Sequence, residues 1–309
     1  QSPVNATSTS DAAAKQAFAE WRYIADALRI HHDTRDLLDD LIVVTGTRYA
    51  AGRALKQDAL QAELERTRLE NHKLQLLRQQ TLAQANINAM LNRPPDTALP
   101  AAAPIALQAN PPPLADLSAT ALDQHPELAR LDAQIAASEN RVILAEKAFR
   151  PDFQLGVGYN SLWNEVDKRP VLGLSINIPL YRGKRNAELD RAKAETRRAN
   201  HTLADRRAAL LAGLASARAR VVESRASVAL YEEKLVPLAA EFLSAAVSDY
   251  QSGAGGFLNV IAAEQQKLET ELAHARTLAD YARHQADLER WTGGAPAHLL
   301  SSLAAGVTP

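Results

Sequence analysis

The chain has 309 residues, and its 35 basic and 36 acidic side chains give a formal net charge of −1. This balance gives no support to nucleic-acid binding, because acidic and basic residues alternate as they do on solvated helix faces. The absence of cysteine excludes disulfides and thiolate metal sites. No apolar run reaches the roughly 20 residues of a membrane-spanning helix, and the composition, rich in Ala, Leu, Glu, Arg and Gln, is typical of long helices and coiled coils.

The first third of the chain predicts a helical hairpin. Residues 1–10 are small and polar and are expected to form a flexible N-terminus. From Asp11, apolar residues at helical spacing predict a long helix that ends at a turn near Tyr49. Apolar residues then recur every seven positions and predict a return helix, which ends before Pro94. The hairpin is therefore expected to span residues 11–95.

A proline-rich segment and a further helix follow. Residues 96–124 contain several prolines and predict an extended linker that lies against the side of the helices. His125 opens the next helix, in which apolar residues alternate three and four apart, as along a coiled-coil seam. Because Pro151 ends this pattern, we expect the helix to span residues 125–150.

Between residues 151 and 182 the apolar period changes from the helical value to two. Two alternating runs predict a β-hairpin, whose polar loop contains Trp163. Each strand is about 8 to 10 residues long, near the roughly 9 to 11 that a tilted strand needs to cross a bilayer. The residues predicted to face the membrane are Phe153, Leu155, Val157, Tyr159, Leu172, Leu174, Ile176 and Ile178.

Residues 183–294 predict a second helical hairpin, and residues 295–309 a C-terminal tail. Gly183 begins the longest helix, which at roughly 65 residues and 1.5 Å per residue would span about 100 Å. Pro237 is expected to kink this helix or to mark its weakest turn. The helix ends at a turn near Tyr250, and its expected apolar pattern runs through Val221, Val228, Leu235, Leu238 and Phe242.

The stretch from Tyr49 to Asn92 occurs twice. Its second copy begins at Tyr250, and the two copies superpose without a gap at a constant offset of 201 residues, so that Gly52 matches Gly253. A duplication of this length indicates two structural halves of similar build within one interlocked body. The same offset places the first-half counterpart of the β-hairpin before residue 1, so that hairpin is expected to be absent from this chain.

These segments together resemble the TolC-type family of outer-membrane efflux proteins, especially members paired with heavy-metal and multidrug exporters. The resemblance covers nearly the whole chain from about Trp21 and depends on the order, spacing and duplication of its motifs. The motifs are RYAAG with KQDAL (48–60), LNRPP (91–95), the segment from HPELARLDAQ to LGVGY (125–159), INIPLYRGKRNAELDRAKAE (176–195) and DYQSG with FLNVIAAE (249–264).

The resemblance implies a mainly α-helical protomer with two repeats of long antiparallel coiled-coil helices, which assembles as a homotrimer. Its β-hairpins would form a barrel surrounded by outer-membrane lipid, and its helices a periplasmic tunnel. The protein would be a passive exit duct of a Gram-negative bacterium for metal ions or drugs. It would receive them from an inner-membrane efflux transporter through a periplasmic adaptor, or membrane fusion protein, and no cofactor is implied.

The resemblance also implies that the helix-to-helix turns form the periplasmic tip and contact the adaptor. Relatives often carry acidic residues just after the turn, which constrict the aperture and bind cations. Here only the first copy keeps an acidic residue at that place, and Gln61 and Ala262 follow three positions later, so we expect a reduced acidic gate. By position, the tip residues are Tyr49, Gly52, Asp58, Tyr250, Gly253 and Asn259.

No pattern predicts a catalytic centre, and we expect no enzyme activity. The His31-His32-Asp33 cluster could bind a metal, but adjacent histidines on a helix point to different sides, unlike the i,i+4 pairs of helical sites, and no metal site is predicted. Asp39-Asp40 and Glu232-Glu233 are typical of solvated helix faces rather than acid–base pairs.

A soluble periplasmic coiled-coil adaptor or scaffold without a pore is the alternative function. It predicts that the hairpin from Phe153 to Leu180 packs its apolar face on the protein's own helices. It also predicts that Leu174→Asp or Ile176→Asp leaves membrane partition unchanged. Against it, a two-stranded hairpin is marginal in water, and in lipid its edges require closure into a barrel with other strands.

Overall fold

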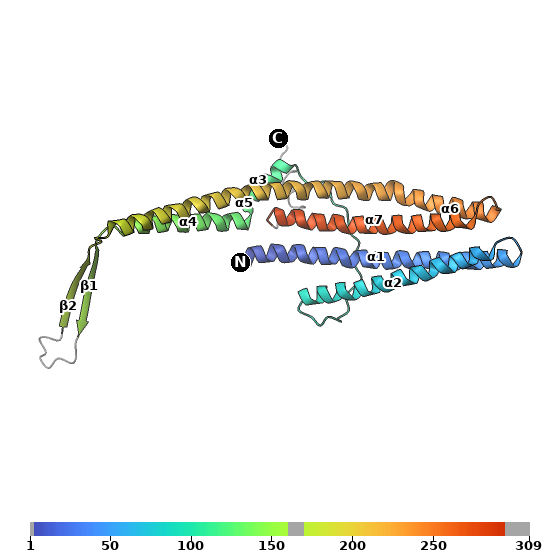
Figure 1. Ribbon diagram of the computed structural model, residues 1–309, viewed down its shortest axis with the longest axis horizontal. Coiled ribbons are helices and arrows are strands. Elements are labelled where there is room, and N and C mark those ends of the chain that lie inside the picture. The colour runs from blue at the N-terminus through green and yellow to red at the C-terminus, as the bar shows by residue number, and fades with distance from the viewer. Residues whose placement is uncertain (1–2, 160–169, 294–309) are drawn as a thin grey trace, which may run out of the picture. The chain divides into compact units, whose positions relative to one another are not determined.

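The computed structural model describes residues 3–159 and 170–293, which form seven α-helices, one π-helical turn and a two-stranded sheet (Figure 1). The chain divides into two compact units. One contains Gln1–Asp123 with Ala212–Pro309, and the other contains Gln124–Leu211. The duplicated stretches both belong to the first unit and the β-hairpin to the second.

The first unit is built from two antiparallel helical hairpins. Helices α1 and α2 form one hairpin, α6 and α7 form the other, and α1 packs along α7 (Figure 1). Because α1 begins at Pro3, residues 3–10 are helical, whereas their composition predicted a flexible segment. The elements of this unit are α1 (Pro3–Ala50), α2 (Lys56–Met90), α3 (Leu114–Gln124), the C-terminal part of α5 (Arg182–Leu230), η2 (Tyr231–Leu235), α6 (Val236–Ser252) and α7 (Phe257–Trp291).

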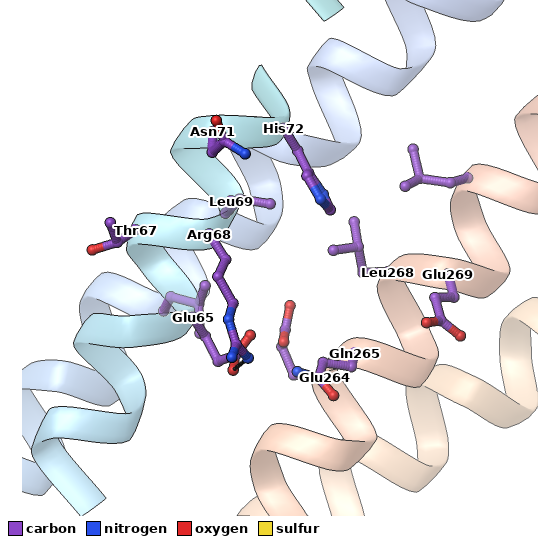
Figure 2. Close-up of a pocket in the computed structure, with 12 residues that line it drawn as sticks. Glu65, Thr67, Arg68, Leu69, Asn71, His72, Glu264, Gln265, Leu268 and Glu269 are labelled. Atoms are coloured by element: carbon purple, nitrogen blue, oxygen red, sulfur yellow. Dashed lines mark hydrogen bonds and ion pairs between the residues drawn. The ribbon is translucent and has the colours of Figure 1, made fainter. Parts of the chain in front are cut away.

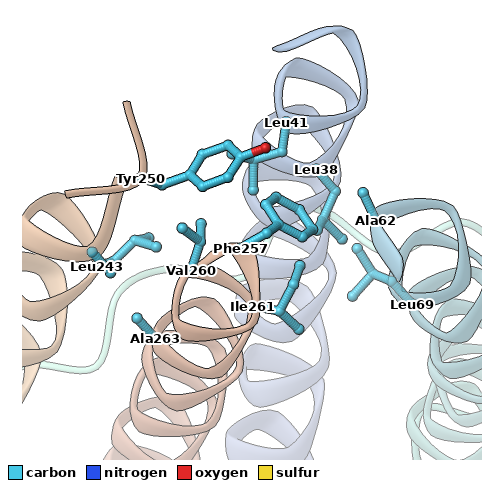
Figure 3. Close-up of a cluster of buried hydrophobic side chains, with 11 residues drawn as sticks. Leu38, Leu41, Ala62, Leu69, Leu243, Tyr250, Phe257, Val260, Ile261 and Ala263 are labelled. Carbon is cyan, nitrogen blue, oxygen red and sulfur yellow. The ribbon is translucent and has the colours of Figure 1, made fainter. Parts of the chain in front are cut away.

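A core of buried side chains joins the two hairpins near their turns (Figure 3). Ala62 and Ala263, which match at the offset of 201, both have no exposed surface, so the helices can approach closely at equivalent places in the two copies. The core cluster consists of Leu38, Leu41, Ala62, Leu69, Leu243, Ala246, Tyr250, Phe257, Val260, Ile261 and Ala263.

The proline-rich linker is shorter than the expected 96–124, because Leu114–Gln124 form α3, and it is held by side chains of the helices. Prolines leave backbone carbonyls without regular partners, and each such carbonyl needs a donor when it is removed from water. Arg22 Nη1 donates to the carbonyl of Ala102 at 2.7 Å, and Arg218 Nε donates to that of Pro112 at 2.7 Å. The Tyr281 hydroxyl accepts from the backbone N–H of Gln108 at 3.0 Å. Side-chain hydrogen bonds therefore fix the path of this segment.

The long helix that leads to the second turn is interrupted one turn before Pro237. The backbone N–H of Val236 donates to the carbonyl of Tyr231, five residues earlier, as in a π-helix. In a regular α-helix the proline ring would collide with the carbonyl of Glu233, and the wider turn relieves this collision. The expected irregularity at Pro237 is thus present.

This π turn corrects the expected apolar pattern of the helix. Before it, Val221 and Val228 are buried, as expected. After it, the buried positions move one residue along the chain, to Ala239 and Leu243, because the π turn inserts one residue into the helical repeat. The expected positions Leu235, Leu238 and Phe242 are 38%, 59% and 53% exposed.

The second unit contains α4 (Pro126–Lys147), the N-terminal part of α5, and strands β1 (Asp152–Tyr159) and β2 (Pro170–Asn177). His125 caps α4, since its Nδ1 accepts from the backbone N–H of Glu127 at 3.3 Å, and Pro126 occupies the first turn. The carboxylate of Glu127 also pairs with Arg206 of α5 at 2.8 Å.

Candidate functional sites

The two helix-to-helix turns have the same backbone geometry. Gly52 and Gly253 both adopt left-handed conformations, with φ of 71° and 83°, which glycine reaches without strain. The backbone N–H of Gly52 donates to the carbonyl of Tyr49 at 2.9 Å, and that of Gly253 donates to the carbonyl of Tyr250 at 3.2 Å. The duplication of the sequence is therefore a duplication of the turn.

The side chains of the two turns have different surroundings. Tyr250 is 5% exposed and packs on Phe257, with ring centroids 5.2 Å apart, whereas its counterpart Tyr49 is 49% exposed. The Arg48 guanidinium lies 4.7 Å from the centroid of the Tyr250 ring and donates to the carbonyl of Gln251 at 2.9 Å. The first hairpin thus encloses Tyr250 of the second.

The equivalent residues Asp58 and Asn259 also differ in their surroundings. The Tyr250 hydroxyl donates to Asp58 Oδ2 at 3.4 Å, while Asn259 is exposed. Burial raises the pKa of Tyr250, and the negative charge of Asp58 raises it further, so the phenol stays protonated and can donate. The structure therefore brings Asp58 and Tyr250 together, leaves Tyr49 and Asn259 at the surface, and places the two glycines at the turns.

A pocket of about 660 Å³ lies farther along the helices, between α2 and α7 (Figure 2). Glu264 of α7 points into it and is 3% exposed, and its Oε1 has no hydrogen-bond partner. Burial raises the pKa of Glu264 to about 7, and the nearby charge of Glu65 contributes, while Lys267 acts in the opposite direction. Glu65 itself is 7% exposed and pairs with Arg68 at 2.6 Å.

This pocket was not predicted from the sequence. A signal was present, because Glu264 follows Val260 and Ile261 at helical spacing and so lies on the apolar face of its helix. An acidic residue on such a face is rarely buried unless it is paired. The burial of Glu65 was harder to predict, since its position matches Gln266 in the second copy, which is exposed.

The β-hairpin has one apolar face. Its strands pair antiparallel with Phe153 opposite Ile176, Leu155 opposite Leu174, and Val157 opposite Leu172. The intervening pairs, such as Gly156 opposite Gly173, carry small or polar side chains on the other face. Each strand has 8 residues. Tyr159 ends β1, Ile178 lies just beyond β2, and Trp163 lies outside the described residues.

The apolar face of the hairpin is uncovered in the chain. The exposed fractions run from 50% for Ile176 to 80% for Val157, and every described residue of β1 is exposed. This finding contradicts the expectation of the alternative function that the hairpin packs on the protein's own helices. A surface of this kind marks a site of contact with a membrane or with another protein.

The histidine cluster on α1 is separated as expected. His31 is buried and meets the ring of His72 at 6.1 Å, and its pKa is lowered by burial and by His72. His32 points elsewhere and pairs with Asp36 at 3.2 Å. Within residues 3–159 and 170–293, no group of three or more His, Asp or Glu side chains is arranged to hold a metal ion. In these same ranges, no helix is both long and apolar enough to cross a membrane.

Comparisons with known proteins agree with this architecture. The sequence model of the outer membrane efflux protein family matches residues 117–294. Among solved structures, the outer membrane protein VceC of Vibrio cholerae superposes with a TM-score of 0.82 at 20% identity, over 94% of this chain and 71% of VceC. The outer-membrane channel OprN gives 0.82 at 20% identity, over 95% and 68%.

A further structure, the open state of the Neisseria gonorrhoeae outer membrane channel MtrE, gives a TM-score of 0.72 at 20% identity, over 94% of this chain and 68% of MtrE. No curated protein sequence matches the chain. At these identities the structural matches show the fold, and the match over residues 117–294 identifies the family.

Proposed function

The chain belongs to the outer membrane efflux protein family, and we propose that it is the exit duct of a tripartite efflux pump. This is a family of channel proteins rather than enzymes. The observation that carries the proposal is the uncovered apolar face of the β-hairpin, in a chain whose duplicated helical hairpins have the fold of outer-membrane channels. The face is what a strand pair in lipid needs, and the small polar face opposite it suits a water-filled lumen.

In this proposal the chain assembles as a homotrimer in the outer membrane of a Gram-negative bacterium. A hairpin in lipid must have its edge N–H and C=O groups paired, so strands of neighbouring copies would complete a barrel. Apolar residues on the outside of the helices support an assembly. On α2, Leu60, Leu64 and Leu74 are 53%, 45% and 66% exposed, and neighbouring copies would cover them.

The turns at Gly52 and Gly253 would then form the periplasmic tip, where a periplasmic adaptor docks and connects the duct to an inner-membrane transporter. Their similar backbones support a contact in which one adaptor surface meets both turns in similar ways. Tyr49 and Asn259 are exposed and would contact the adaptor, whereas Asp58 would hold the two hairpins together through Tyr250. The cargo would be metal ions or drugs.

Conductance in planar lipid bilayers tests the duct. We expect the full-length protein to form pores, and Leu174→Asp to reduce insertion at least tenfold, because a charge on the lipid-facing side of a strand costs about 2–4 kcal/mol near the bilayer centre for basic residues and less for acidic ones. Ser175→Asp is the matched control, because Ser175 is the next residue in β2 and its side chain lies on the opposite face from that of Leu174. A wild-type protein that forms no pore, or equal effects of the two substitutions, would contradict the proposal.

A further inference from the structure

The pocket between α2 and α7 contains a buried carboxyl group, one oxygen of which has no hydrogen-bond partner. Glu264 is 3% exposed, and its Oε1 accepts no hydrogen bond. A buried carboxylate without donors is costly, and natural proteins rarely keep one unless something pairs with it. Figure 2 shows the Glu264 side chain directed into the space between the two helices, on the side where Glu65 and Arg68 lie.

The charges around the pocket leave Glu264 as the unpaired group. Glu65 forms an ion pair with Arg68 at 2.6 Å, and Lys267 forms one with Glu271 at 2.8 Å. The remaining groups near the pocket are Glu269, which is exposed, His72 of α2, and His31 of α1, which meets the His72 ring. When Glu264 is ionised, its negative charge is the one left without an ion-pair partner among these groups, and a ligand with a single positive charge would balance it.

The walls of the pocket favour an organic cation. Four leucines line it, namely Leu38, Leu69, Leu268 and Leu272. The volume of about 660 Å³ lies within the roughly 300–1,000 Å³ of small-molecule sites, which are mostly apolar with a few polar groups that fix orientation. An inorganic divalent ion would need about six oxygen ligands. Among the described residues, no cluster of three or more metal-ligating side chains exists.

We propose that this pocket binds an amphipathic organic monocation, a primary ammonium or guanidinium on an apolar body, with Glu264 as the carboxylate that receives the charged group. The leucines would cover the apolar body, and an N–H of the cation would donate to the orphan carboxylate oxygen. The site belongs to the helical unit, so it does not depend on the proposed duct and can be tested without a pump or a membrane.

The test uses the purified full chain in detergent and dansylcadaverine, a fluorescent primary amine with an apolar body. We expect saturable binding with blue-shifted emission, and at least tenfold weaker binding to Glu264→Gln, which keeps the size of the side chain and removes its charge. Glu269→Gln is the matched control: it removes one acidic group from the exposed rim, and it should change the affinity less than twofold. Leu272→Trp should also weaken binding, since it fills the pocket and leaves Glu264 in place.

The pH dependence gives a second readout. Because the pKa of Glu264 is about 7, binding should strengthen roughly tenfold between pH 6 and pH 8 in the wild type and stay constant in Glu264→Gln. His72→Gln should keep this dependence, which separates the carboxylate from the histidine that lines the same pocket. The thermal unfolding of each variant, followed by circular dichroism, confirms that it is folded.

Three results would overturn the proposal. They are the absence of saturable binding above that of empty micelles, equal affinity of the wild type and Glu264→Gln, and equal binding of an N-pentyl dansylamide that lacks the ammonium group. None of them would bear on the duct, because bilayer conductance is measured independently.

Discussion

The two turns of the helical unit share a backbone and differ in what their side chains contact. At equivalent places, Gly52 and Gly253 have nearly the same φ, but Tyr49 lies at the surface and Tyr250 in the core. A duplication therefore preserves local geometry, which depends on residues close in sequence, more strictly than burial, which depends on neighbours from the other half. This explains how two copies of one hairpin can acquire different roles in one protein.

The largest difference is expected between the two tyrosines. Tyr250→Ala should lower the free energy of unfolding by about 3 kcal/mol or more, because it opens a cavity beside Phe257 and removes the ring beneath Arg48. Tyr49→Ala should change it by no more than about 0.5 kcal/mol, since its ring is half exposed. Urea denaturation of both variants measures the contrast, and similar losses would show that the two turns are energetically equivalent.

The glycines should behave alike. Gly52→Pro and Gly253→Pro should each cost about 3 kcal/mol, because proline fixes φ near −65° and lacks the N–H that donates in both turns. Both should also weaken adaptor docking, which crosslinking can measure. Gly46→Ala serves as a control within α1, where an added Cβ meets open space and should stabilise slightly. Unaltered stability and crosslinking in both proline variants would contradict the shared geometry.

A third contrast concerns Glu63 and Glu264, which match in the two copies. Glu264 has a folded-state pKa of about 7 against an ordinary value of 4.5, so the folded state retains a proton that the unfolded chain has released. Stability should therefore fall as pH rises from about 4.5 to about 7. Glu264→Gln should remove this fall and raise stability at pH 8 by about 2–3 kcal/mol. Glu63→Gln is the control, because Glu63 is exposed, and thermal unfolding at pH 5 and pH 8 compares the two.

The smallest effect is expected at the contact between the turns. Asp58→Asn keeps an acceptor for the Tyr250 hydroxyl but removes the charge, so stability should drop by less than about 1 kcal/mol. Asn259→Asp places a charge at the equivalent exposed position and should have less effect still. A larger loss of unfolding free energy for Asn259→Asp than for Asp58→Asn in denaturant melts would contradict the conclusion that Asp58, and not Asn259, contacts the other hairpin.

Much of the fold could be predicted because its signals are local or periodic. The heptad spacing predicted the hairpins, the period of two predicted the strands, and the repeat predicted both turns, with glycine where φ is positive. The enclosure of Tyr250 and the burial of Glu65 could not be predicted in this way. They depend on which helix of one half meets which helix of the other, and a single-helix pattern does not contain that information. The apolar spacing in the sequence also gave no sign of the residue that the π turn inserts before Pro237, so the buried positions after it were predicted one residue too early.

The residue inserted by the π turn changes which side of the helix faces the core. Each residue advances an α-helix by about 100°, so one extra residue turns everything that follows by that angle relative to the seam before it. Small Ala239 thereby faces the neighbouring helix, while the larger Leu238 and Phe242 face outward. One inserted residue therefore decides which side chains of α6 join the core, and it leaves two large apolar side chains, Leu238 and Phe242, at the surface.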